Sequence, residues 1–204
     1  MAGLAGAARA GGGGQQRHFM IVLASASPRR LELLTAAGWQ VEVRPADVDE
    51  TLRPHEPASD YVLRLARAKA RAVAPARVPI VGADTVVVVA GEVLGKPADD
   101  GAAAAMLARL AGHEHQVLTG FCVLSPHGRE RNGVEATSVW FAPLSAQQIA
   151  SYVATGEPRG KAGAYAIQGR AACFIPRIEG SYSNVVGLPL AAVWGALRAL
   201  SEAD

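Results

Sequence analysis

The sequence predicts an α/β protein built on one mixed β-sheet. Strand-like apolar runs alternate along the chain with helical segments, as in α/β folds. Two pairs of strand-like runs are separated only by short turns, one near Ala90–Gly91 and one at the letters SPHG, which indicates two hairpins. Because hairpin strands are antiparallel and helix-connected strands are usually parallel, we expect both directions in the sheet.

The N-terminal segment is rich in Ala and Gly and contains four consecutive glycines, which favour no single structure. We therefore expect a disordered tail over residues 1–17 and a single folded domain over residues 18–204. The tail lacks the basic-then-apolar layout of a secretory signal peptide. Met20 opens the first expected strand and is a candidate start of translation.

The elements of the domain follow from periodicity and from turn residues. In the first half we expect strands over 19–25, 39–45 and 78–97 (the last a hairpin), a helix over 28–37 ended by Gly38, and a helix over 59–74 capped by Ser59 or Asp60. In the second half we expect a helix over 99–111, a hairpin within 115–144, a helix from Ser145 to Ala154, a Gly-rich loop over 156–189 and a last helix from Leu190.

Composition narrows the class of protein. The net charge of +2 over 204 residues is too weak a bias to indicate nucleic-acid binding. No apolar run reaches the length of a membrane span, so we expect no membrane partner. Cys122 and Cys173 lie far apart in the sequence and suggest no disulfide framework, which favours a reducing compartment, the cytoplasm.

The stretch LASASPRRLELL predicts a helix start with Ser27 as N-cap, followed by Arg29 and Arg30 in the first turn. Cations there oppose the helix dipole and cost about 0.3–1 kcal/mol each. A helix N-terminus binds phosphate well, and arginines add paired donors for its oxygens. The first turn therefore indicates a polyanion site. The alternative is that both arginines face solvent or pair with Glu32 or Asp49.

Lys69 lies within the apolar face of the helix expected over 59–74. Val62, Leu65, Ala66 and Val73 share that face at 100° per residue. A lysine in this position either extends to solvent along its apolar stem or meets an anion.

Asp84 interrupts an apolar strand, where an unpaired carboxylate is costly, so it needs a cation, a metal or a hydrogen-bonding partner. Lys96 lies on the returning strand of the same hairpin. A two-residue turn places Lys96 opposite Thr85, and a three-residue loop places it on the face of Asp84. The alternative to a functional role is a structural Asp84–Lys96 pair that holds the hairpin.

The acidic loop supplies Asp47, Asp49 and Glu50. With Asp84, these oxygen ligands suit Mg²⁺ or Mn²⁺, which bind few carboxylates plus substrate phosphates. The alternative is a solvated loop. The sequence contains neither a P-loop motif nor a GxSxG motif.

These segments together resemble a known family. LASASPRRLELL, DVDE, YVLRLARAKA, GADTVVVVAGEVLGKP, GAYAIQG and GSYSNVVGLPL occur in order from Met20 to Leu190 and resemble the Maf (septum-formation-inhibitor-like) nucleotide pyrophosphatases. The branch that acts on dTTP and UTP is the most similar.

The resemblance implies an elongated, twisted sheet in two lobes around a deep cleft, often as a homodimer. It implies metal-dependent hydrolysis of a nucleoside triphosphate to the monophosphate and pyrophosphate, limiting incorporation of non-standard nucleotides and linked to arrest of cell division. The site residues that it implies are Glu50, Lys69, Asp84 and Lys96 in catalysis, Glu50 and Asp84 at the metal, and Ser25, Arg29, Arg30, Thr85 and Gln168 in substrate binding. Whether Asp84 acts as base or metal ligand stays open.

Gln168 carries the expected base preference, because a side-chain amide pairs with both O4 and N3–H of uracil or thymine. Cytosine shows the reverse pattern, so the amide must be held in one orientation, for example by Thr85. One departure from the family pattern GEPxDKAGAY is Gly160, which replaces an acid and weakens the expected hold on Lys161.

Two other functions fit the same residues. One is a non-catalytic nucleotide-binding regulator of septum formation, which would use the arginines but would not need Asp84 beside Lys96. The other is a pyrophosphatase for modified purine nucleotides, against which Gln168 argues.

Overall fold

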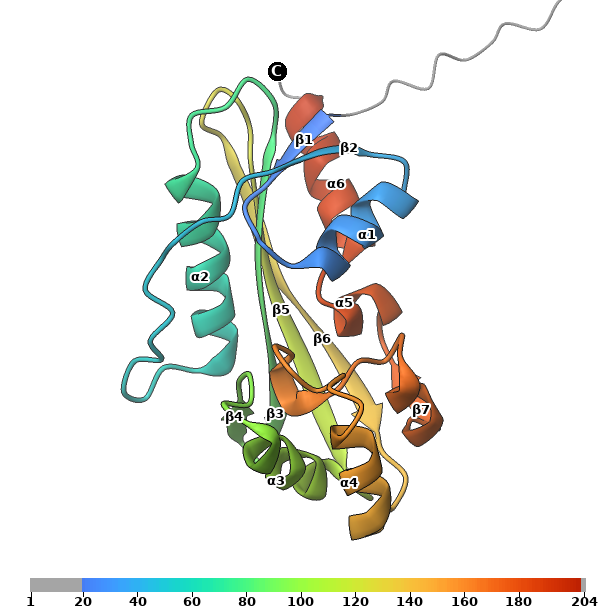
Figure 1. Cartoon of the computed structure of the whole chain (residues 1–204). Coiled ribbons are helices and arrows are strands. Elements are labelled where there is room, and N and C mark those ends of the chain that lie inside the picture. The colour runs from blue at the N-terminus through green and yellow to red at the C-terminus, as the bar shows by residue number, and fades with distance from the viewer. Residues whose placement is uncertain (1–19, 203–204) are drawn as a thin grey trace, which may run out of the picture.

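The computed structural model describes residues 20–202, so the expected tail over 1–17 lies outside the described residues. Its sheet has seven strands, ordered β2-β1-β3-β5-β6-β7 with β4 paired to β3 (Figure 1). β1 is parallel to β2 and β3, and every other pair is antiparallel, which confirms the mixed sheet. The strands are β1 (Met20–Leu23), β2 (Gln40–Val43), β3 (Ile80–Val89), β4 (Glu92–Leu94), β5 (Glu114–Leu124), β6 (Glu130–Trp140) and β7 (Arg177–Glu179).

The five described helices of eight or more residues match the expected ones closely. The helices are α1 (Pro28–Ala36), α2 (Ala58–Ala72), α3 (Asp100–Leu110), α4 (Ala146–Val153), α5 (Tyr182–Val186) and α6 (Leu190–Ser201), with short 3₁₀ turns η1 (Ala162–Ala164) and η2 (Arg170–Phe174). Of these, α5, η1 and η2 lie in the segment 156–189 that was expected to be a loop. Within residues 20–202, no helix combines the length and the apolar character needed to cross a membrane.

Two of the expected helix caps differ in the structure. Ser27 occupies the N-cap position of α1, but its side chain makes no capping hydrogen bond. The N-cap of α2 is Pro57, whose carbonyl accepts from the amide of Tyr61, so the prediction of Ser59 or Asp60 is wrong. The Ser145 prediction is confirmed, because its hydroxyl and the Gln148 side chain form a reciprocal capping box.

The molecule has two lobes that share the long strands β3, β5 and β6 (Figure 1). In one lobe, α1 and α6 cover one face of the sheet around a core that includes Leu34 and Leu197, and α2 covers the other face with Ala66 buried against it. In the other lobe, α3 and α4 pack around a second core that includes Leu107 and Tyr152. This arrangement confirms the expected two-lobed α/β fold.

Two strand glycines bring α2 unusually close to the sheet. A Cβ atom on Gly82 would lie 2.3 Å from the carbonyl oxygen of Ala66, and one on Gly120 would lie 2.3 Å from that of Val62. Gly120 is paired with Asp84 across the β3–β5 ladder. The missing side chains therefore allow α2 to lie directly on β3, which carries Asp84, and on its neighbour β5.

Candidate active site

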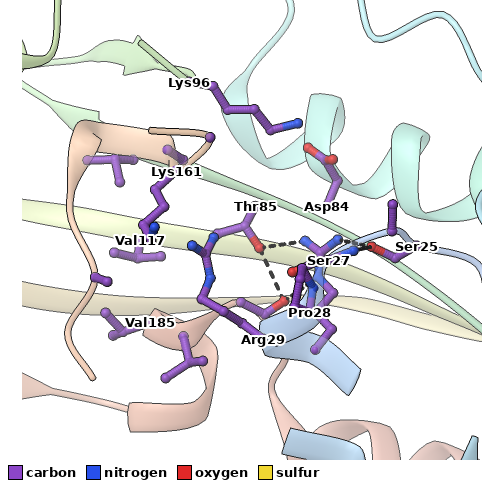
Figure 2. A pocket seen from close by; sticks show the side chains of 18 of the residues that line it. Ser25, Ser27, Pro28, Arg29, Asp84, Thr85, Lys96, Val117, Lys161 and Val185 are labelled. Carbon is purple, nitrogen blue, oxygen red and sulfur yellow. Dashed lines mark hydrogen bonds between the residues drawn. The ribbon is translucent and has the colours of Figure 1, made fainter. Parts of the chain in front are cut away.

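A cleft of about 610 Å³ opens between the lobes (Figure 2). Its walls come from the N-terminus of α1, the middle of β3, the acidic loop before α2, and the segment that contains η1. All nine site residues implied by the resemblance line it: Ser25, Arg29, Arg30, Glu50, Lys69, Asp84, Thr85, Lys96 and Gln168. Segments far apart in the chain thus supply one cavity.

Arg30 forms part of the cleft floor, with only 7% of its surface exposed. Its guanidinium donates to the carbonyl oxygen of Gly187 at 2.7 Å, to Ser25 Oγ at 2.9 Å and to Thr85 Oγ1 at 3.0 Å. All three acceptors are neutral, and no carboxylate of residues 20–202 forms an ion pair with Arg30. Burial lowers the pKa of this guanidinium, and the charge of Asp84 partly opposes that shift.

Arg29, the neighbour of Arg30 in the chain, projects into the cleft (Figure 2). Burial lowers the pKa of its guanidinium, and Glu32 opposes the shift electrostatically. Within the described chain neither Arg29 nor Arg30 forms an ion pair, so the alternative of pairing with Glu32 or Asp49 is wrong. The alternative of facing solvent does not hold for Arg30, which is buried, and Arg29 is half-buried. Since no side chain caps α1, the N–H groups of its first turn also remain available at the cleft.

Lys69 meets two carboxylates instead of reaching solvent. Its ammonium lies 2.7 Å from Asp84 Oδ1 and 2.6 Å from Glu50 Oε1, and its side chain is 8% exposed. Lys96 Nζ lies 3.9 Å from Glu50 Oε2 on an exposed side chain. The alternative of a structural Asp84–Lys96 pair is therefore absent from the described residues, because Lys69 occupies the position beside Asp84.

Glu50 is the acidic-loop residue that reaches the cleft, and the Tyr61 hydroxyl fixes its position by donating to its backbone carbonyl at 2.8 Å. Burial alone would raise the pKa of Glu50, but Lys69 lowers it below its ordinary value. Asp47 and Asp49, the other oxygen ligands that the acidic loop offers, lie away from this position. Neither lines the cleft, and Asp49 accepts from the amide of Thr51 in a local turn.

The expected link between Thr85 and Gln168 is absent from the described residues. The Thr85 hydroxyl accepts from Arg30, shares a 2.9 Å hydrogen bond with Thr119 Oγ1, and lies 3.3 Å from the carbonyl oxygen of Gly187. Gln168 is exposed at the rim of the cleft and has no hydrogen bond to the rest of residues 20–202. Its amide is thus free to turn.

Sequence reasoning gave Lys161 no role, yet it lines the cleft. Its ammonium donates to the carbonyl oxygen of Glu157 at 2.5 Å. The position of Lys161 therefore does not depend on the side chain at position 160. Gly160 itself has φ +69°, a conformation that favours glycine. The signal in the sequence was the place of Lys161 in the segment that matches the family pattern GEPxDKAGAY.

A buried guanidinium, free helix amides and a lysine-bridged carboxylate pair, all facing one cleft, suit a phosphorylated ligand. Fold and site therefore define an α/β protein built to bind a polyanion. The Maf-like protein family model matches residues 20–200, and the chain belongs to that family.

Close relatives cover most of the chain. A dTTP/UTP pyrophosphatase from Anaeromyxobacter sp. (strain Fw109-5) is 56% identical over 184 residues, which are 88% of this chain and 89% of the relative. A dTTP/UTP pyrophosphatase from Geotalea uraniireducens (strain Rf4) is 53% identical over 190 residues, 90% of this chain and 96% of the relative. A solved HAM1 protein from Coxiella burnetii aligns with 90% of this chain and 99% of its own, with 15% identity and a TM-score of 0.45, too distant a likeness to support an argument.

Proposed function

We propose that this protein hydrolyses nucleoside triphosphates, dTTP and UTP before others, to the nucleoside monophosphate and pyrophosphate. The observation that carries the proposal is Arg30, a buried cation with neutral acceptors only, placed beside Asp84 in the cleft. A desolvated charge of this kind calls for an anionic ligand. The names of the two relatives supply the substrate class.

The reaction is attack of water on the α-phosphorus with departure of pyrophosphate. Lys69 occupies one carboxylate oxygen of Asp84, and the other oxygen orients the water and takes its proton. Charge grows on the leaving pyrophosphate in the transition state. Arg30, Lys69 and Lys96 stabilise that charge, and Glu50 holds Lys69 in place.

A divalent cation, Mg²⁺ or Mn²⁺, fits this site. Asp84 and Glu50 both contact the Lys69 ammonium, so two carboxylates lie in the same part of the cleft. The described residues contain no group of three or more His, Cys, Asp or Glu side chains that could hold a metal, and Mg²⁺ commonly binds one or two carboxylates plus substrate phosphates. When bound, the cation neutralises phosphate charge.

A nucleotide panel tests the proposal. The wild-type protein is assayed with dTTP, UTP, CTP, GTP and ATP, with pyrophosphate and phosphate measured separately, in Mg²⁺, in Mn²⁺ and after chelation. We expect pyrophosphate as the product, activity that requires the cation, and kcat/KM for dTTP and UTP at least about tenfold above the others, or roughly 1.4 kcal/mol. Release of phosphate instead, or a purine ranked first, would contradict the proposal.

We also propose that the protein works as a homodimer in the cytoplasm. The resemblance to the family supports the dimer, and the exposed free thiol of Cys173 suits a reducing compartment. Light scattering after size-exclusion chromatography measures the mass directly, and the mass of a single chain of 21.1 kDa would refute the dimer.

A further inference from the structure

Part of the lining on one side of the cleft is apolar and has two cations beside it. Val117 and Val185 line it, with the Lys161 side chain next to Val117 and Arg29 alongside (Figure 2). Asp84 lies on the other side in the same view. An apolar wall is poorly suited to a triphosphate and well suited to the flat face of a base.

The Lys161 ammonium has a hydrogen-bond donor on this side that is not used within residues 20–202. Of the three N–H groups of its ammonium, one donates to the Glu157 carbonyl at 2.5 Å and a second reaches the Arg159 carbonyl at 3.5 Å. The third has no acceptor among residues 20–202. Burial lowers the pKa of Lys161, the nearby charge of Arg29 lowers it further, and Glu157 opposes both.

The segment that carries Lys161 is fixed against the sheet. The amide of Gly163 donates to the carbonyl oxygen of Gly95 at 3.1 Å, and the amide of Ala164 donates to that of Lys161 at 3.0 Å. A Cβ atom on Gly163 would lie 2.7 Å from Val87, so the segment packs closely on β3. The ammonium therefore has a defined position.

A donor-only group solves a problem that Gln168 leaves open. The exposed Gln168 amide can turn to match either uracil or cytosine, because nothing in the described chain holds it. An ammonium only donates. It matches the O4 carbonyl of uracil or thymine and opposes the N4 amino group of cytosine. O4 lies on the edge of the base remote from the ribose, and thus away from the phosphates at Asp84.

We propose that Lys161 is a specificity-determining residue, which donates a hydrogen bond to O4 of uracil or thymine and thereby disfavours cytosine. This inference rests on the proposed function, since it names a contact within the same cleft.

The test compares kcat/KM for UTP and CTP in the wild-type protein and three variants. Lys161→Gln keeps a donor for the Glu157 carbonyl but adds an acceptor for N4 of cytosine, and Lys161→Met removes the polar group. We expect the UTP-to-CTP ratio to fall at least about tenfold in both. Lys161→Arg keeps a donor-only cation, and its ratio should stay within about threefold of wild type.

Arg170→Met is the matched control, because Arg170 is an exposed cation of the same segment 156–189 that does not line the cleft. Its ratio should equal that of wild type. Melting temperatures report on folding, and Lys161→Gln and Lys161→Arg retain a donor for the Glu157 carbonyl if Lys161→Met unfolds.

An unchanged ratio in Lys161→Gln would overturn the inference. So would an equal loss on all nucleotides, which would place Lys161 on the phosphates or on O2. A wild-type protein that hydrolyses triphosphates without preferring UTP to CTP would instead refute the proposed selectivity, whatever the variants do.

Discussion

At the scale of single residues, Asp84 and Lys69 depend on each other. Each lies where an apolar side chain is expected, and each would be a costly buried charge alone. Their 2.7 Å contact removes that cost and leaves one Asp84 oxygen for chemistry. The Asp84–Lys69 ion pair therefore contributes both to folding and to the proposed function.

Replacing Asp84 by Asn tests its role. Asp84→Asn retains the shape and a carbonyl oxygen for Lys69 but loses the base, so turnover should fall by roughly 10²-fold or more while nucleotide binding persists. Single-turnover rates and equilibrium binding of UTP measure the two effects. Asp60→Asn, an exposed change in the first turn of α2, is the control and should leave turnover unchanged. Full turnover in Asp84→Asn would refute the mechanism.

The sequence identified Asp84, Lys69 and the two arginines because each breaks a local pattern of polarity or charge. It did not identify their partners. Arg30 donates to Thr85, 55 positions away, and to Gly187, 157 positions away. Contacts at such separations follow from the packing of elements and leave no periodic signal in the chain.

At the scale of elements, long segments were predictable and short ones were not. Every helix of eight or more residues was expected, because each spans at least two turns of amphipathic pattern. The segment 156–189 was expected as a loop, yet it contains η1, η2, β7 and α5. These pieces have three to five residues, too few to show a period, and tertiary contacts such as the burial of Asn184 under β5 and β6 hold α5 in place.

The close packing of α2 on the sheet leads to a second prediction. Gly120→Ala would place a Cβ atom 2.3 Å from the carbonyl oxygen of Val62, so α2 must move. We expect the free energy of unfolding to fall by about 1–3 kcal/mol, as for overpacked cores, and turnover to fall because α2 carries Lys69. Urea unfolding and kcat for UTP measure both effects.

Gly195→Ala is the matched control for that change. It makes the same substitution inside α6, where an added Cβ meets nothing within 4 Å. Alanine favours a helix interior over glycine, so stability should rise by about 0.5–1 kcal/mol with turnover unchanged. If the Gly120→Ala protein is as stable and as active as wild type, the close packing of α2 on β5 is not required for either property.

At the scale of the whole molecule, both lobes share β3, β5 and β6, so we expect them to unfold together. Buried titratable groups then act on the stability of the entire domain. His115 is one of these, at 2% exposure, with Nε2 2.8 Å from the Tyr165 hydroxyl and its ring edge against Phe141. Burial lowers the pKa of His115 to about 4, and burial raises the pKa of Tyr165 above its ordinary value.

This lowered pKa predicts a loss of stability in mild acid. The unfolded chain protonates His115 below its ordinary pKa of about 6.5, whereas the folded protein does so only near pH 4, so the unfolded state binds more protons between these values. The contribution of neutral His115 to the free energy of unfolding is therefore fully present above pH 6.5. It decreases as the pH is lowered, by about 2 kcal/mol between pH 7.5 and pH 5. To isolate this contribution, Tyr165→Phe is compared with His115→Phe/Tyr165→Phe, since both lack the hydroxyl and only one retains the imidazole. Urea unfolding across this pH range should show the loss in Tyr165→Phe beyond that in the double variant. Parallel pH profiles for the two would mean that His115 titrates alike in the folded and unfolded states.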